Sequence, residues 1–123
     1  MIRIKNNITK GLVVFEVSEN VSKQDLLDAL EELSQYSISI RNIKIIQIDK
    51  GAKPTFKPIE NINLAFAAKK YFYLFDSIKF AFVTLKSMNM AFFILAITSI
   101  INKRFKAKVF SSEKEAEEWL FFE

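Results

Sequence analysis

The sequence predicts an α/β fold built on a mainly parallel sheet of four or five strands, with an antiparallel hairpin at its N-terminal edge and about four helices. Segments rich in Ile, Val and Phe alternate with segments whose apolar residues recur every three or four positions. Such alternation favours parallel strands joined by right-handed crossovers. The chain has 123 residues, 50% of them hydrophobic, so we expect one domain over residues 1–123 whose core needs no disulfide or metal.

The first elements are a predicted hairpin and a helix. Ile2–Lys5 alternates apolar and basic side chains, as in a short edge strand, and Lys10–Val17 contains a β-branched run. Ser22 followed by Asp25 is a capping box that starts a helix predicted over Lys23–Tyr36. The apolar stripe of this helix consists of Leu26, Leu27, Leu30 and Leu33.

Two strands are apolar enough to need burial on both faces, which predicts central positions in the sheet. They are Ile43–Asp49 and Ile78–Leu85. Between them we expect a loop over Lys50–Pro58, marked by one Gly and two Pro, and a helix over Glu60–Phe75. The core stripe of that helix is predicted to be Leu64, Ala67, Ala68, Tyr71, Leu74 and Phe75.

The far side of this second helix carries Phe66 and Tyr73, flanked by Lys69 and Lys70. Aromatic rings between lysines suit an interface with an amphipathic or anionic partner. Ordinary surface aromatics beside snorkelling lysines are the alternative.

The third predicted helix, Met88–Lys103, has two apolar sides. One side is a broad arc that should face the sheet, and the other carries Met88, Phe92 and Leu95. A neighbouring element of the chain, a second subunit or a bound apolar ligand would each cover this second side, because monomers rarely expose such patches.

The C-terminal segment contains a strand over Lys106–Phe110 and a helix that continues through Trp119, opened by Ser112 and Glu115. We expect Trp119 to anchor this helix on the core. The run Val109-Phe110, Glu115-Ala116 and Trp119-Leu120 resembles the terminal V-F-x-x-x-x-E-A-x-x-W-L signature of SpoIIAA-like proteins in the STAS superfamily. The order of elements fits that family over nearly the whole chain, and Ile78–Val83 resembles its penultimate strand. The resemblance implies a STAS-like fold and a small cytoplasmic protein, and it indicates fold more than function.

Better-studied STAS proteins are anti-sigma-factor antagonists with a phosphorylatable Ser in an Asp-Ser-Ser-Gly-like loop. The matching stretch here is Asp49–Thr55, in which no Ser follows Asp49 and Thr55 is the only hydroxyl. We therefore expect no phosphorylation switch at this loop. The SpoIIAA-like branch also resembles a lipid-binding fold, which keeps an apolar ligand as an alternative.

The composition excludes several kinds of chemistry. Without Cys or His, the chain cannot form disulfides, zinc fingers, Ser–His or Cys–His nucleophiles, or His general bases. The carboxylate pairs Asp25–Asp28 and Glu115–Glu118 lie at helix starts, where negative charge complements the helix dipole. We expect no catalytic residues, no metal, no cofactor and no enzyme activity.

The net charge of +4 comes from scattered basic residues, so no specific nucleic-acid partner is expected. Lys50, Lys53 and Lys57 precede a predicted helix start, which makes their loop a candidate anion-binding site, with a solvated turn as the alternative. The longest apolar stretch, residues 88–101, is shorter than the ~20 residues that a membrane span needs. We expect neither a membrane span nor a signal peptide, and a cytoplasmic protein.

These observations favour a non-catalytic interaction module that acts through apolar helix surfaces as a homodimer or with another protein. The surface would comprise Met88, Phe92 and Leu95, with Phe66 and Tyr73 as weaker contributors. The alternative is a small lipid- or fatty-acid-binding protein with a Phe-lined pocket.

Overall fold

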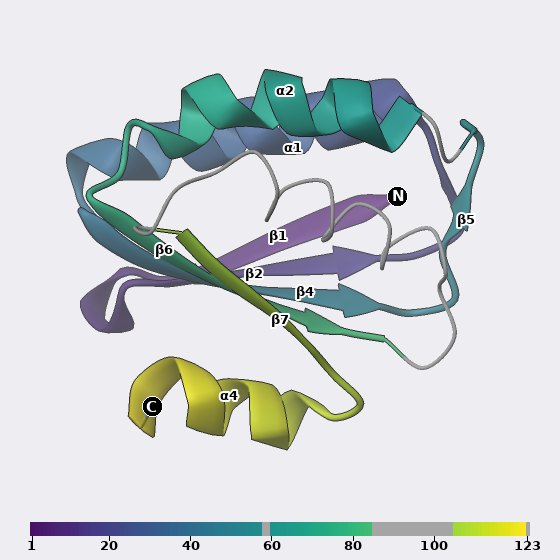
Figure 1. The fold of residues 1–123 in the computed structure, drawn as a ribbon. Helices are drawn as coiled ribbons and strands as arrows, with labels where there is room; N and C mark the ends of the chain where they lie inside the picture. The colour runs from purple at the N-terminus through teal and green to yellow at the C-terminus, as the bar shows by residue number, and fades with distance from the viewer. Residues whose placement is uncertain (58–59, 85–104, 123) are drawn as a thin grey trace.

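The computed structural model describes residues 1–57, 60–84 and 105–122, which form a sheet with helices on both faces (Figure 1). Helices α1 and α2 lie side by side over one face, and α4 lies beneath the other. The strands of the main sheet are β1 (Ile2–Asn7), β2 (Leu12–Val17), β4 (Asn42–Asp49), β6 (Ser77–Val83) and β7 (Phe105–Phe110). The described helices are α1 (Lys23–Ser34), α2 (Glu60–Phe72) and α4 (Glu113–Phe122).

The five-stranded sheet has the order β1-β2-β4-β6-β7. Strands β1 and β2 are antiparallel, and the other neighbours are parallel. The predicted fold class is therefore confirmed, including the N-terminal edge hairpin. The two strands predicted to be central, β4 and β6, are both interior strands. The predicted helix over residues 88–103 lies outside the described residues.

Helix α1 starts at the predicted capping box. The backbone N–H of Asp25 donates to Ser22 Oγ (3.0 Å), and the backbone N–H of Ser22 donates to Asp25 Oδ2 (2.9 Å). The α-helix ends at Ser34, earlier than the predicted end at Tyr36, because the chain tightens into the 3₁₀ helix η2 (Gln35–Ile38). Both ends of α1 are thus fixed by local hydrogen bonds.

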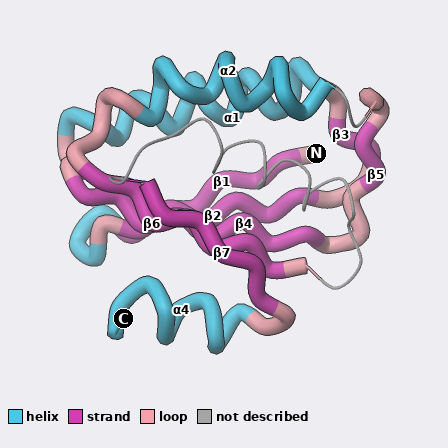
Figure 2. The backbone as a smooth tube through the Cα atoms, viewed as in Figure 1, coloured by secondary structure: helices cyan, strands magenta, loops and turns pink. Residues whose placement is uncertain are grey.

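A second, two-stranded parallel sheet joins β3 (Asn20–Val21) to β5 (Lys53–Pro54) (Figure 2). The sequence predicts only a loop over Lys50–Pro58, so this pairing corrects that prediction. The backbone N–H of Lys53 donates to the carbonyl of Glu19 (2.7 Å), and that of Thr55 donates to the carbonyl of Val21 (2.9 Å). Two-residue strands have no readable periodicity, and these two form because the segments that follow β2 and β4 emerge side by side.

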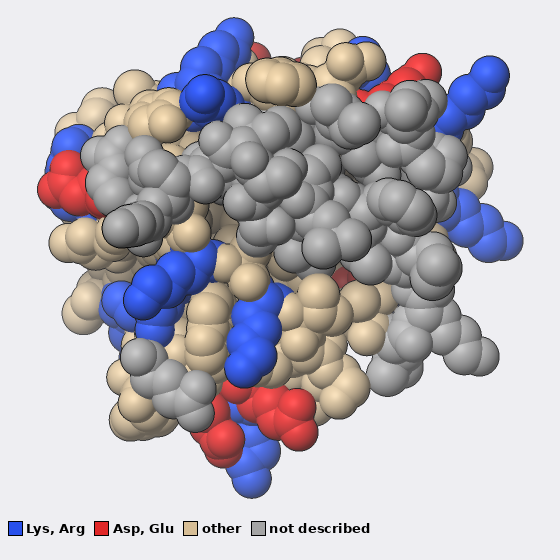
Figure 3. Space-filling model, viewed as in Figure 1, with Lys and Arg blue, Asp and Glu red and all other residues tan. Residues whose placement is uncertain are grey.

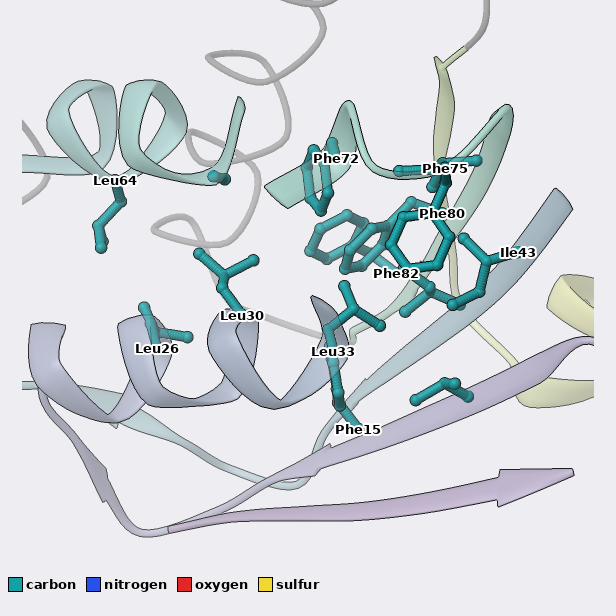
Figure 4. Packing of buried hydrophobic residues seen from close by; sticks show 14 of the residues in the cluster. Phe15, Leu26, Leu30, Leu33, Ile43, Leu64, Phe72, Phe75, Phe80 and Phe82 are labelled. Atoms are coloured by element: carbon teal, nitrogen blue, oxygen red, sulfur yellow. The ribbon is translucent and has the colours of Figure 1, made fainter. Parts of the chain in front are cut away.

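The core between the sheet and α1 and α2 is rich in Phe (Figure 4). The rings of Phe80 and Phe82 stack with centroids 4.3 Å apart, and Phe72 of α2 packs edge-on against Phe80 at 6.3 Å. Phe75 is fully buried beside them. Aromatic packing of this kind fixes α2 on β6.

The stripe of α2 departs from the prediction at its C-terminal end. Leu74, predicted to be core, is 44% exposed, whereas Phe72 is buried. The helix ends at Phe72, and the chain then turns, so helical spacing no longer decides where Leu74 points.

The opposite core lies between the sheet and α4. Ala116 and Leu120 are buried against a sheet surface that includes Ile46 and Ala81. Trp119, which the sequence predicts to be the anchor, is only partly buried and packs against the ring of Phe110 at 5.5 Å. The chief anchors of α4 are therefore Ala116 and Leu120, with Trp119 at the margin.

Replacing Leu120 with Ala tests this packing. Leu120→Ala should lower the free energy of unfolding by about 2–5 kcal/mol, because it leaves a cavity beneath the sheet. Phe122 of the same helix is 84% exposed, so Phe122→Ala should change it by less than about 0.5 kcal/mol. Urea denaturation followed by circular dichroism measures both. Equal midpoints for the two variants would show that α4 contributes little to the core.

Candidate functional site

Three large apolar side chains are exposed on α2 and on the turn that follows it. Phe66 is 58% exposed, Leu74 is 44% exposed and Tyr73 is 41% exposed. We call Phe66, Tyr73 and Leu74 the α2 outer surface. The sequence predicts Phe66 and Tyr73 on the far side of the helix and Leu74 in its core stripe, but both Tyr73 and Leu74 follow the end of the helix at Phe72, and Leu74 is exposed.

Basic and aromatic neighbours surround this surface. Lys69 Nζ lies 5.8 Å from the centre of the Tyr73 ring, and Lys70 Nζ lies 4.9 Å from that of Tyr71. The Tyr73 ring also meets Phe105 of β7 edge-on at 5.6 Å. Tyr73 is therefore held in place, and Phe66 projects further into solvent. The other predicted surface residues, Met88, Phe92 and Leu95, lie outside the described residues.

The loop that follows β4 is ordered by the Asp49 carboxylate. Oδ1 of Asp49 accepts a hydrogen bond from the backbone N–H of Ala52 (2.7 Å), and Oδ2 accepts one from Thr84 Oγ1 (3.3 Å). Gly51, which lies between Asp49 and Ala52, has φ +78°, a left-handed conformation that a glycine adopts without strain. Asp49 thus closes a tight turn and ties β4 to the end of β6. Thr55 is exposed after this turn, with Oγ1 3.4 Å from the carbonyl oxygen of Val21.

The three lysines of the candidate anion-binding loop have different surroundings. Lys50 forms an ion pair with Glu16 of β2, and Lys5 of β1 binds the same carboxylate at 2.6 Å. Lys53 lies in β5, and Lys57 is exposed before α2. Lys50 therefore already has an anionic partner within the chain, and anion binding by this loop stays a prediction.

Glu16 is the carboxylate at the centre of this charged group. Its side chain is 12% exposed. Hydrogen bonds from Lys5 and then Lys50 lower the pKa of Glu16 from 4.5 to about 2. The carboxylate is thus ionised throughout the neutral range and joins three segments of the chain.

In the described residues, no helix is long and apolar enough to cross a membrane.

Comparisons with solved structures place the fold. The phosphorylated form of SpoIIAA, a Bacillus cell fate determinant, is similar with a TM-score of 0.55 and 11% identity. The match covers 97% of this chain and 98% of that one. This chain has a SpoIIAA-like fold.

A second SpoIIAA-like structure agrees. It is an uncharacterised protein of the DUF3478 family from Shewanella loihica PV-4, with a TM-score of 0.57 and 13% identity. The match covers 98% of this chain and 92% of that one. No family model and no curated protein matches the sequence. The SpoIIAA-like fold expected from the C-terminal signature is thus confirmed.

The pKa of Glu16 predicts a defined acid sensitivity. Because folding lowers this pKa, the Glu16 ion pairs stabilise the fold fully above about pH 4.5, and this stabilisation is lost as the pH falls toward 2. In Glu16→Gln, stability should fall less steeply between these values. Chemical denaturation at a series of pH values measures this dependence. Glu31→Gln on α1 is the control, and if it has the same effect as Glu16→Gln, the pairing is not responsible.

The turn after β4 predicts the absence of a phosphorylation switch. It lacks the Ser of the switch motif, and Asp49 is engaged in the turn. Thr55→Ala and Thr55→Glu should both leave the oligomeric state and the thermal midpoint unchanged. Light scattering and mass spectrometry of protein from its native cells check this. Phosphate found on Thr55, together with a changed oligomeric state in Thr55→Glu, would contradict the prediction.

Proposed function

We propose that this chain is a non-catalytic protein-interaction module that forms a homodimer through apolar helix surfaces. The SpoIIAA-like fold supports the general class, because the similar protein SpoIIAA is a cell fate determinant that takes a phosphorylated form. A shared fold is evidence of architecture, and the function must rest on the surface of this chain.

The observation that carries the proposal is the exposure of Phe66 on α2. The opposite side of the same helix is fully buried, with Leu64, Ala68 and Phe72 in the core. Burying a large apolar side chain such as Phe66 contributes about 1.5–3 kcal/mol, which stays unused while Phe66 faces water. Leu74 and Tyr73 extend the apolar area at the end of the helix. Aromatic residues of this kind are enriched at the centres of protein interfaces.

The lysines beside α2 suit the edge of such an interface. Lys69 and Lys70 lie against Tyr73 and Tyr71, so their stems and charges cover the aromatic area from the side. The proposed interface also includes Met88, Phe92 and Leu95, on the sequence pattern of the helix predicted over residues 88–103.

The described carboxylates support a non-catalytic role. The two described acids with a lowered pKa are Glu16, bound by two lysines, and Asp25, whose pKa is lowered first by the backbone N–H of Ser22. General acid–base catalysis is most efficient with a pKa near the working pH, and these shifts move both groups away from it. Their interactions serve the sheet and the start of α1.

The alternative is a lipid- or fatty-acid-binding protein. Phe72, Phe75, Phe80 and Phe82 fill the core between the sheet and the helices, and Figure 4 shows them directed toward one another. A cavity bordered by Phe15 and Phe80 has a volume of only about 20 Å³. Because these side chains fill the core among the described residues and leave no space for an acyl chain there, they do not favour the lipid alternative. The dimerisation experiment below tests it as one of its outcomes.

Phe66→Glu tests the proposed interface. The unmodified chain should be a dimer by light scattering and by native mass spectrometry, with no added lipid mass. Phe66→Glu should weaken the dimer by about tenfold or more, because a charge replaces a central aromatic ring. Phe122→Glu is the matched control, since Phe122 is a Phe that is even more exposed than Phe66 (84% against 58%) but lies on α4, across the sheet from α2.

The outcomes separate the candidates. A folded Phe66→Glu monomer beside a dimeric control supports the proposal, with circular dichroism confirming the fold. An unmodified chain that is monomeric and carries no added mass contradicts it. A monomer with added lipid mass favours the alternative.

A further inference from the structure

Three lysines lie side by side across the sheet, on the face that α4 partly covers. Lys44 of β4 is the register partner of Lys79 of β6, and Lys79 is the partner of Lys106 of β7. Their neighbours Ile43 and Ile78 belong to the core beneath α1 and α2, and Phe105 packs against that core. Because side chains alternate along a strand, the three lysines point to the opposite face. We call Lys44, Lys79 and Lys106 the lysine row.

The lysine row borders an open cavity of about 380 Å³. Asn42, Ser77 and Leu120 also line it, so it has both polar and apolar walls. Its volume falls within the range of about 300–1,000 Å³ that is usual for small-molecule sites. Figure 3 shows basic side chains gathered over β7, above α4.

The row brings like charges together without a described carboxylate to neutralise them. Adjacent strands lie about 4.8 Å apart, and like charges directly opposite each other destabilise a sheet. In the described residues, the ion pairs use Lys5, Arg41 and Lys50, and no member of the row takes part in one. Glu123, which follows α4, lies outside the described residues.

Contacts with α4 explain the position of only some of the lysines in the row. Lys79 Nζ donates to the carbonyl of Trp119 (3.2 Å) and lies 5.1 Å from the Trp119 ring centre. This contact stabilises the C-terminal end of α4, where a cation complements the helix dipole. Lys44 Nζ lies 5.5 Å from the Phe121 ring centre, and Lys106 is exposed. The helix end therefore explains the position of Lys79 and leaves the charge of Lys106 unexplained.

We propose that this cavity binds the phosphate group of a small anionic molecule through the lysine row. Three ammonium groups supply several charge-assisted hydrogen-bond donors, and lysine is a common phosphate ligand. Leu120 borders the cavity at its edge, but its side chain is buried against the sheet. The site lies across the sheet from the α2 outer surface.

Inorganic pyrophosphate is the probe. Isothermal titration calorimetry at low ionic strength should show saturable binding to the unmodified chain, since exposed charges are screened by salt. Lys44→Gln combined with Lys106→Gln should raise the Kd by about tenfold for each lysine removed. Lys79 is left unchanged because it also holds α4.

Lys108→Gln is the matched control. Lys108 belongs to the same strand and the same face as Lys106, but it does not line the cavity, and its Nζ lies 5.5 Å from the Phe110 ring centre. The Kd of Lys108→Gln for pyrophosphate should stay within about twofold of that of the unmodified chain. If Lys108→Gln weakens pyrophosphate binding as much as the loss of a row lysine does, binding follows net charge alone and the proposal is overturned. The absence of saturable binding to the unmodified chain would also overturn it.

Thermal unfolding without ligand separates binding from folding. The Lys44→Gln and Lys106→Gln double variant should melt at the same temperature as the unmodified chain or higher, because it relieves like-charge repulsion. A clearly lower midpoint would mean that the lysines stabilise the fold, and would overturn the proposal.

Vesicles distinguish two sources of the phosphate. Phosphatidylglycerol vesicles, compared with phosphatidylcholine vesicles, test whether a lipid headgroup occupies the row. Pyrophosphate binding without vesicle binding assigns a soluble ligand. Vesicle binding that the double variant abolishes assigns a headgroup on the same lysines.

Discussion

The burial of β4 on both faces is the constraint on which the rest of the structure depends. Ile45 and Ile46 are adjacent in sequence, point to opposite faces and are both fully excluded from solvent. One layer of helices cannot cover both residues. The chain therefore places α1 and α2 over Ile45 and α4 under Ile46, and β2 and β6 flank β4 in the sheet.

Toward its two ends β4 is no longer buried on both faces, and polar and charged side chains occur there. At the carboxyl end, Asp49 uses both carboxylate oxygens to fix the turn and the neighbouring strand. At the amino end, Lys44 occupies the α4-facing side two residues before Ile46, where α4 gives way to an open cavity. The apolar centre gives the sheet its rigidity, and its ends leave room for charged groups.

Local signals explain which features could be predicted. The Ser22–Asp25 capping box needs only neighbouring residues, and the structure contains both of its hydrogen bonds. Leu74 was assigned to the core by extending helical spacing past Phe72, where the helix ends. Trp119 was favoured as the anchor of α4 for its size, but the geometry of packing buries Leu120 more deeply. The exposure of Phe66 followed from helical spacing within α2.

The sequence by itself determined the order of the five main strands and of the described α-helices, the central place of β4 and β6, and the start of α1, because these follow from periodicity and from contacts within a few residues. Only the tertiary structure decided which charges meet. Lys44, Lys79 and Lys106 come together because parallel pairing aligns strands that are far apart in the sequence. Lys50 reaches Glu16 through the pairing of β2 with β4. The distance between two charges depends on which strands pair and in which register, and for strands far apart in the sequence this is decided only when they pack into one sheet.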